Sequence, residues 1–176
     1  MAMSRRGIVV ILEPFLQAPV AADLRLILAI VHSSLHLERI GDHAVNIAKI
    51  YTITKDLPSN ATIVQQLTEM GDIVVDMVRT AMDALRRRDK ELCETLPKLD
   101  DPVDRLNRNM HFEVAKLADD RGALDWGMHM NLVARALERV GDNAVDIGEQ
   151  VSFLITGEFR EFTDASHPGG VVADGR

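Results

Sequence analysis

Four carboxylates of this sequence occur as two pairs with the same spacing. The four acids are Glu38, Asp42, Glu138 and Asp142. The first pair lies in residues 37–49, LERIGDHAVNIAK, and the second in residues 137–149, LERVGDNAVDIGE. The segments are offset by 100 residues without a gap, and eight of their thirteen positions are identical, which marks an internal repeat. Because four residues make about one helical turn, each pair lies on one helix face.

Such pairs are candidate ligands for a cation. Ionised acids that face a helix-packing seam are costly unless they are paired or bound to a cation, and acids one turn apart repel each other. Gly41 and Gly141 precede the second acid of each pair, and each costs about 1 kcal/mol in a helix interior relative to alanine. We therefore expect another group to approach the backbone closely at both glycines. Oxygen ligands alone suit hard cations such as Mg²⁺, Ca²⁺, Mn²⁺ or ferric iron.

Salt bridges are the alternative explanation, and the spacing does not decide between the two. Arg135 lies on the acidic face of its helix and is expected to pair with Glu138. Arg39 and Arg139 each follow a glutamate directly, about 100° further round the helix. Both are therefore expected to be poor partners for the acids of their own helix.

A third acidic pair, Asp100 and Asp104, lies between the two copies. If the chain is helical here, Asn107 and His111 fall on the same face. The alternative is that Asp101 caps a helix and that Asp104 interacts with the helix dipole in the first turn. One residue can serve both purposes.

Helical periodicity accounts for most of the chain, so the predicted class is all-α. The predicted elements are residues 19–56, residues 60–88, a short helical piece that ends at Pro97, a helix that starts near Asp101, and residues 124–156 with Gly157 as C-cap. Residues 158–176 lack this periodicity and are predicted to be disordered.

The first helix has apolar residues on two faces and is therefore expected to pack on two sides. One face, in line with Glu38 and Asp42, contains Leu24, Leu28, Val31 and Leu35. The other contains Leu26, Ile30, Leu37, Ile40, Ala44 and Ile47. A polar strip between them, away from the acids, contains His32, His36 and His43.

Composition excludes several classes of protein. The formal charge is −7 and the only basic run is residues 86–88, so nucleic-acid binding is not expected. No apolar run approaches 18 residues, so no membrane span is expected. The apolar run at residues 7–12 is too short for a signal peptide. The single Cys93 fits a reducing compartment, and a cytoplasmic location is expected.

The chain resembles the PhoU family of bacterial phosphate-transport regulators. The resemblance rests on residues 18–25, 37–42, 100–104 and 137–158. It implies three-helix bundles in tandem, each of which carries an iron or zinc cluster in some members; otherwise the cofactor is an unknown divalent cation. It also implies that Asp100 and Asp104 face Glu138 and Asp142 as metal ligands. Glu38 and Asp42 would be ligands in a preceding bundle.

The sequence departs from the family pattern at its start, because the first two helices of the first bundle are missing. We expect residues 1–58 to be the last helix of the first repeat, residues 59–157 to be a complete second bundle, and residues 158–176 to be a disordered tail. Glu38 and Asp42 then lack facing acids, and we expect metal at the second copy first. An exposed apolar stripe on the first helix predicts a homodimer or higher oligomer formed through that helix.

The resemblance implies a regulator of phosphate uptake and of the phosphate-starvation response. It implies contacts with components of the phosphate ABC transporter and with a sensor histidine kinase. A helical scaffold whose acids form only salt bridges is one alternative. A di-metal bundle enzyme is another, but the Glu-x-x-His motif of ferritin-like sites does not occur in the chain, and catalysis is not expected.

Overall fold

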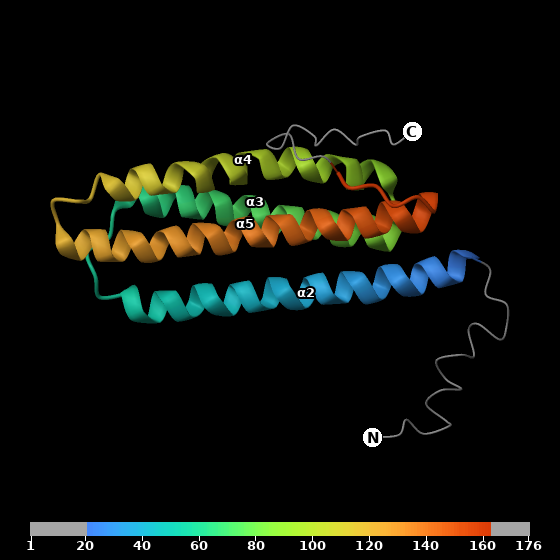
Figure 1. Ribbon diagram of the computed structural model, residues 1–176, viewed down its shortest axis with the longest axis horizontal. Coiled ribbons are helices and arrows are strands. Elements are labelled where there is room, and N and C mark those ends of the chain that lie inside the picture. Colours follow the sequence, from blue (N-terminus) through green and yellow to red (C-terminus); the bar gives the residue numbers. More distant parts are fainter. Residues whose placement is uncertain (1–20, 163–176) are drawn as a thin grey trace, which may run out of the picture.

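The computed structural model describes residues 21–162, which form four helices and no strand. The helices are α2 (Ala21–Thr54), α3 (Ala61–Arg87), α4 (Lys90–Ala115) and α5 (Arg121–Thr156), as shown in Figure 1. The all-α prediction is confirmed. In this part of the chain, no helix has the length and apolar character needed to cross a membrane.

Helices α3, α4 and α5 form a three-helix bundle. They contact one another, and α2 packs along the outer side of α5 (Figure 1). The largest fully buried side chains of the bundle include Ile63, Met70, Met77, Leu96, Met110 and Ile147. Because α5 contacts all three other helices, its side chains are placed to connect α2 with the bundle. Whether the chain divides into domains at residue 58 stays a prediction.

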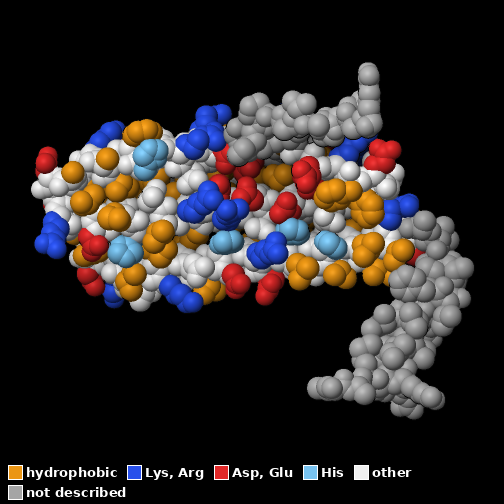
Figure 2. All heavy atoms as spheres, in the orientation of Figure 1, with side chains coloured by type: hydrophobic (Ala, Val, Ile, Leu, Met, Phe, Trp, Pro, Cys, Tyr) orange, Lys and Arg blue, Asp and Glu red, His pale blue; other side chains and the backbone are white. Residues whose placement is uncertain are grey.

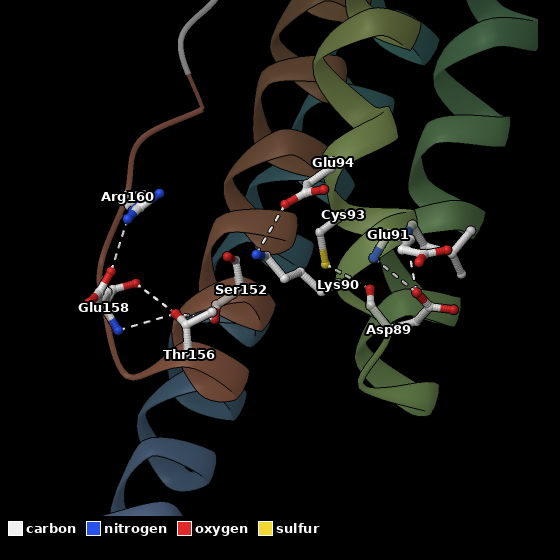
Figure 3. Close-up of polar contacts among 10 residues, drawn as sticks. Asp89, Lys90, Glu91, Cys93, Glu94, Ser152, Thr156, Glu158 and Arg160 are labelled. Carbon is white, nitrogen blue, oxygen red and sulfur yellow. Dashed lines mark hydrogen bonds and ion pairs between the residues drawn. The ribbon is translucent and has the colours of Figure 1, made fainter.

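Side-chain caps determine where the bundle helices begin. The carboxylate of Asp89 accepts hydrogen bonds from the backbone N–H groups of Glu91 and Leu92, and the Glu91 bond is drawn in Figure 3. Asp120 accepts two such bonds at the start of α5, so α5 begins at Arg121, three residues earlier than predicted. Gly157 ends α5 with φ 77°, which confirms the predicted C-cap.

The predicted break between residues 97 and 101 is wrong. Helix α4 runs without interruption through Pro97 and Pro102. Proline removes a helical hydrogen bond. However, Leu96 before the first proline and Val103 after the second are fully buried in the bundle core. Their packing overrides the local preference of the prolines. Asp101 is therefore not an N-cap, and the whole acidic segment lies in the middle of α4.

Helix α2 packs on the bundle through one apolar face and leaves the other exposed. Leu37, Ile40 and Ile47 pack against the bundle core, as predicted. The opposite face keeps several large apolar side chains 40–51% exposed: Ile27, Leu28, Val31, Leu35 and Val45. Ile30 is 52% exposed although it lies on the same face as Leu37.

Residues 158–162 follow α5 without regular secondary structure and are held by specific contacts. The Thr156 hydroxyl accepts the Glu158 N–H, and Arg160 pairs with the Glu158 carboxylate (Figure 3). The Phe162 ring packs beside Cys93 in a small apolar cluster. The disorder of residues 158–176 stays a prediction. Residues 163–176 and the apolar run at 7–12 lie outside the described residues.

Candidate functional site

The acids of α4 and the second acid pair meet between α4 and α5. Asp104 and Glu138 are both only 9% exposed. Burial raises the pKa of both Glu138 and Asp142, and the nearby negative charge of Asp104 adds to this rise. The structure therefore brings the three carboxylates together in the arrangement that the resemblance implies. Their role as metal ligands stays a prediction.

Asp100 completes this acidic cluster, which we define as Asp100, Asp104, Glu138 and Asp142. A Cβ atom on Gly141 would lie only 2.5 Å from Oδ1 of Asp100. Any side chain at position 141 would therefore displace the Asp100 carboxylate. The expected close approach is confirmed at Gly141, and the approaching group is the facing acid of α4.

Arginines partly neutralise the cluster. Arg135 Nη1 lies 2.6 Å from Glu138 Oε1, as predicted, and Arg108 Nη1 lies 3.4 Å from Asp104 Oδ2. Arg139 Nη1 lies 3.2 Å from Asp142 Oδ2, and its Nε lies 3.7 Å from Glu138 Oε2. The prediction that Arg139 is a poor partner is wrong. Its side chain is long enough to reach Asp142 one turn further along the helix, across the angle between their Cα atoms.

Burial outweighs these arginines in setting proton affinity. Burial raises the pKa of Glu138, and repulsion from Asp142 adds to this, while Arg135 and Arg139 lower it. Burial likewise raises the pKa of Asp142, and Arg139 opposes the effect. The cluster therefore holds negative charge at an energetic cost that another cation would relieve.

The cluster does not form a ready ligand set. Within residues 21–162, no group of three or more His, Cys, Asp or Glu side chains is placed to hold a metal ion. Carboxylate oxygens are suitable ligands for hard cations, but arginines bind Asp104, Glu138 and Asp142 in this arrangement. A cation could bind there only if these arginines moved away.

The first acid pair has quite different surroundings. Glu38 and Asp42 are exposed on α2 and make no ion pair with any residue from 21 to 162. A Cβ atom on Gly41 would meet nothing within 4 Å, so the expected close approach is wrong at this copy. The structure therefore does not join this pair to the acidic cluster.

His111, which was expected on the face of Asp100 and Asp104, is exposed, and its ring lies against Phe112.

Sequence reasoning missed two further acids of α5, Asp146 and Glu149. They follow Asp142 at steps of four and three residues, so the acidic face continues for two more turns. Burial raises the pKa of Glu149 to about 7, although its Oε1 accepts a hydrogen bond from the Phe162 N–H at 2.6 Å. Both acids lie within the second copy, where the first copy has Asn46 and Lys49, so comparing the positions that differ between the copies would have revealed this extension.

His36 links α2 to this face, although it was predicted on a polar strip. Its Nδ1 lies 2.9 Å from Asn143 Oδ1 and 3.3 Å from Asp146 Oδ2. Burial raises the pKa of Asp146, while His36 and Arg39 lower it. The prediction failed because the apolar pattern does not show which edge of the strip turns towards α5.

Comparison with known proteins gives a consistent result. Residues 3–51 and 67–151 match the PhoU domain family. The chain is 37% identical over 144 residues to a phosphate-specific transport system accessory protein PhoU homolog of Zymomonas mobilis, covering 81% of this chain and 60% of the relative. A homolog with the same description from Pseudomonas aeruginosa is 34% identical over 152 residues, covering 86% and 61%. The chain thus spans about three fifths of the length of these curated relatives.

Two solved structures have the same helical arrangement. The crystal structure of PhoU from Pseudomonas aeruginosa superposes with a TM-score of 0.70 at 33% identity, covering 80% of this chain and 68% of that one. The regulatory protein PhoU from Streptococcus pneumoniae superposes with a TM-score of 0.74, covering 89% and 74%. The latter is 24% identical, so that similarity concerns the fold alone.

Proposed function

Because this chain belongs to the PhoU family, we propose that it regulates phosphate transport by binding other proteins rather than by catalysis. The observation that carries the proposal is its 37% identity over 144 residues with a protein named as an accessory protein of the phosphate-specific transport system. The proposed partners are components of the phosphate ABC transporter and a sensor histidine kinase, which the family resemblance implies. We also propose that the chain is located in the cytoplasm.

Expression in a bacterial strain that lacks its own phosphate regulator tests this function. We expect the chain to lower alkaline phosphatase in phosphate-rich medium, because the regulator damps the starvation response. Western blotting confirms that the chain accumulates. Unchanged phosphatase with an abundant, folded chain would contradict the proposal and favour the salt-bridged scaffold, which the arginine pairs of the acidic cluster also support.

The exposed face of α2 is the proposed self-association surface, and its occupant is a second copy of the chain. Residues 26–37 contain no Asp, Glu, Lys or Arg, so antiparallel pairing of two such segments brings no like charges together. Leu28, Val31 and Leu35 are 40–50% exposed on this segment. A two-fold axis near Val31 would bury the same side chains on both copies.

Light scattering after size exclusion measures this association. The unmodified chain is expected to have the mass of a dimer, and Leu28→Glu with Leu35→Glu is expected to have the mass of a monomer. Val75→Glu is the control, because Val75 is 46% exposed on α3, away from the proposed surface. A monomeric unmodified chain would overturn the proposal.

Cation binding by the acidic cluster is the remaining part of the proposal. When bound, an iron or zinc cluster or a divalent cation would neutralise Asp100, Asp104, Glu138 and Asp142 in place of the arginines. Glu38 and Asp42 would be ligands only if another helix supplied facing acids, which the antiparallel pairing proposed above does not do. The raised pKa values of Glu138 and Asp142 support a site that gains from added positive charge.

Metal analysis of protein purified without a metal-affinity tag tests this part. Asp104→Asn with Asp142→Asn is expected to abolish bound metal, because it removes two ligand charges from the cluster. The matched control, Glu38→Gln with Asp42→Asn, makes the same change at the exposed pair and is expected to retain the metal. Equal metal content in both double variants would show that the cluster is not the site.

A further inference from the structure

A groove between α2 and α5 concentrates positive charge on an acidic protein. Its volume is about 370 Å³, and its polar lining consists of His43, Asn46, Lys49, Arg135 and Arg139. Figure 2 shows Lys, Arg and His side chains gathered where α2 lies beside α5, near the middle of this face. We define these five residues as the basic groove.

No acid is among the described residues that line the basic groove, although the whole chain has a formal charge of −7. Two helices that are far apart in the sequence contribute to it. His43, Asn46 and Lys49 recur every three residues along α2, and Arg135 and Arg139 lie one turn apart on α5. The packing of α2 on α5 therefore assembles the groove.

The cations of the basic groove retain free donors. Lys49 is exposed and makes no ion pair with another residue in the range 21–162. The side chains of Arg135 and Arg139 are 53% and 49% exposed although both contact the acidic cluster. A guanidinium has five N–H donors, and the contacts with the acidic cluster use Nη1 of Arg135 and Nε and Nη1 of Arg139. The donors that remain are available to a ligand.

The chemistry of these donors selects a compact, multiply charged anion. Guanidinium groups bind phosphate oxygens in a planar, paired geometry, and an ammonium group adds a mobile point charge. At about 370 Å³, the groove has room for more than one phosphate group. The other lining residues, Ile50, Leu132 and Ala136, offer no competing charge.

We propose that the basic groove binds a phosphate-type oxyanion, either free orthophosphate or a short phosphate chain. This site is separate from the protein contacts of the proposed function and does not depend on them. It requires α2 and α5 to remain packed together, because neither helix carries the full set of donors. The ligand would therefore stabilise the packing of α2 on the bundle.

Isothermal titration calorimetry of the intact chain at low ionic strength tests the proposal. Orthophosphate and pyrophosphate are titrated separately, with chloride as the background anion. We expect binding that weakens as sodium chloride is added, because exposed charges are screened. Tighter binding of pyrophosphate would identify a phosphate chain as the ligand class, and equal binding would identify free orthophosphate. No heat of binding from either anion would overturn the proposal.

Three substitutions locate the site. Lys49→Gln and Arg139→Gln are each expected to weaken binding by about fivefold or more, because each removes a charge-assisted hydrogen bond. Arg79→Gln is the matched control, since it makes the same charge change on the exposed face of α3. Circular dichroism confirms that each variant is folded. A loss with Arg79→Gln equal to that with Lys49→Gln would show only a general charge effect and would overturn the groove as the site.

Discussion

The two copies of the repeated motif differ in almost everything except their sequence. Glu138 is buried and paired with Arg135, whereas Glu38 is exposed. Gly141 lies against the Asp100 carboxylate, whereas Gly41 faces open space. The same residues thus form part of an acidic cluster in one copy and an unoccupied helix surface in the other.

The difference comes from the facing helix rather than from the motif. Helix α4 supplies the acids that surround the second copy, while no helix in residues 21–162 covers the corresponding face of α2. The copies also differ at positions within the repeat. Asn46 and Lys49 correspond to Asp146 and Glu149, so one helix contributes to the basic groove and the other continues the acidic face.

The largest expected difference between the copies concerns the isoleucines at equivalent positions. Ile147 is fully buried in the bundle core, whereas Ile47 is only partly buried. Ile147→Ala is expected to lower the free energy of unfolding by about 3 kcal/mol, because it leaves a cavity in a packed core. Ile47→Ala is expected to lower it by about 1 kcal/mol. Urea denaturation measures both, and equal losses would show that α2 is packed as tightly as α5.

The next prediction concerns Glu149 and Lys49. The pKa of Glu149 is about 7 in the folded chain and 4.5 as the ordinary value. Between these values the folded state holds a proton that the unfolded state releases, so this group's contribution to stability falls as pH rises from 4.5 to 7. Glu149→Gln removes this dependence and is expected to stabilise the chain by up to about 2 kcal/mol at pH 8, but little at pH 5.

Thermal or urea unfolding at both pH values checks this expectation. Lys49→Gln is the control at the equivalent position. It is expected to change the free energy of unfolding by less than about 0.5 kcal/mol at either pH, because Lys49 is exposed. If Glu149→Gln changed the free energy of unfolding by the same small amount at pH 5 and pH 8, Glu149 would not hold a proton in the folded state.

Alanine substitutions at the two glycines are expected to change the free energy of unfolding in opposite directions. Gly41→Ala is expected to raise the free energy of unfolding by about 1 kcal/mol, because alanine favours the helix and the added Cβ meets nothing. Gly141→Ala is expected to lower it by about 1 kcal/mol, because displacing Asp100 outweighs the same helical gain. Chemical denaturation measures the pair, and two stabilising substitutions would show that the Asp100 carboxylate turns aside freely.

Much of the fold was predictable because helix signals are local. The periodic apolar positions, the proline near the first helix and the Gly157 C-cap placed three of the four helices to within a few residues. The continuous α4 was not predictable in this way, since the prolines act locally whereas the burial of Leu96 and Val103 depends on the other helices. Tertiary packing therefore decided the one serious error.

The candidate site shows the same limit. The spacing of the acids identified the members of the acidic cluster, and the pairing of Arg135 with Glu138 was also predictable. The reach of Arg139 and the inward position of His36 were not. Both depend on side-chain conformation and on the rotation of one helix against another, which a residue pattern does not specify.

The smallest expected difference concerns the arginines of the two motifs. Arg139 contacts Asp142 and lies near the buried Glu138, so Arg139→Gln leaves two carboxylates less compensated. We expect a loss of about 0.5–1 kcal/mol, limited by the half-exposed position of the guanidinium. Arg39→Gln is expected to lower the free energy of unfolding by less than about 0.3 kcal/mol, because Arg39 is exposed and its attraction to Asp146 is weak at the surface. Urea titrations at low and high salt measure both losses, and the Arg139 loss should shrink as salt screens the charges. A loss for Arg139→Gln that salt leaves unchanged would assign the stabilisation to packing of the arginine stem and not to its charge.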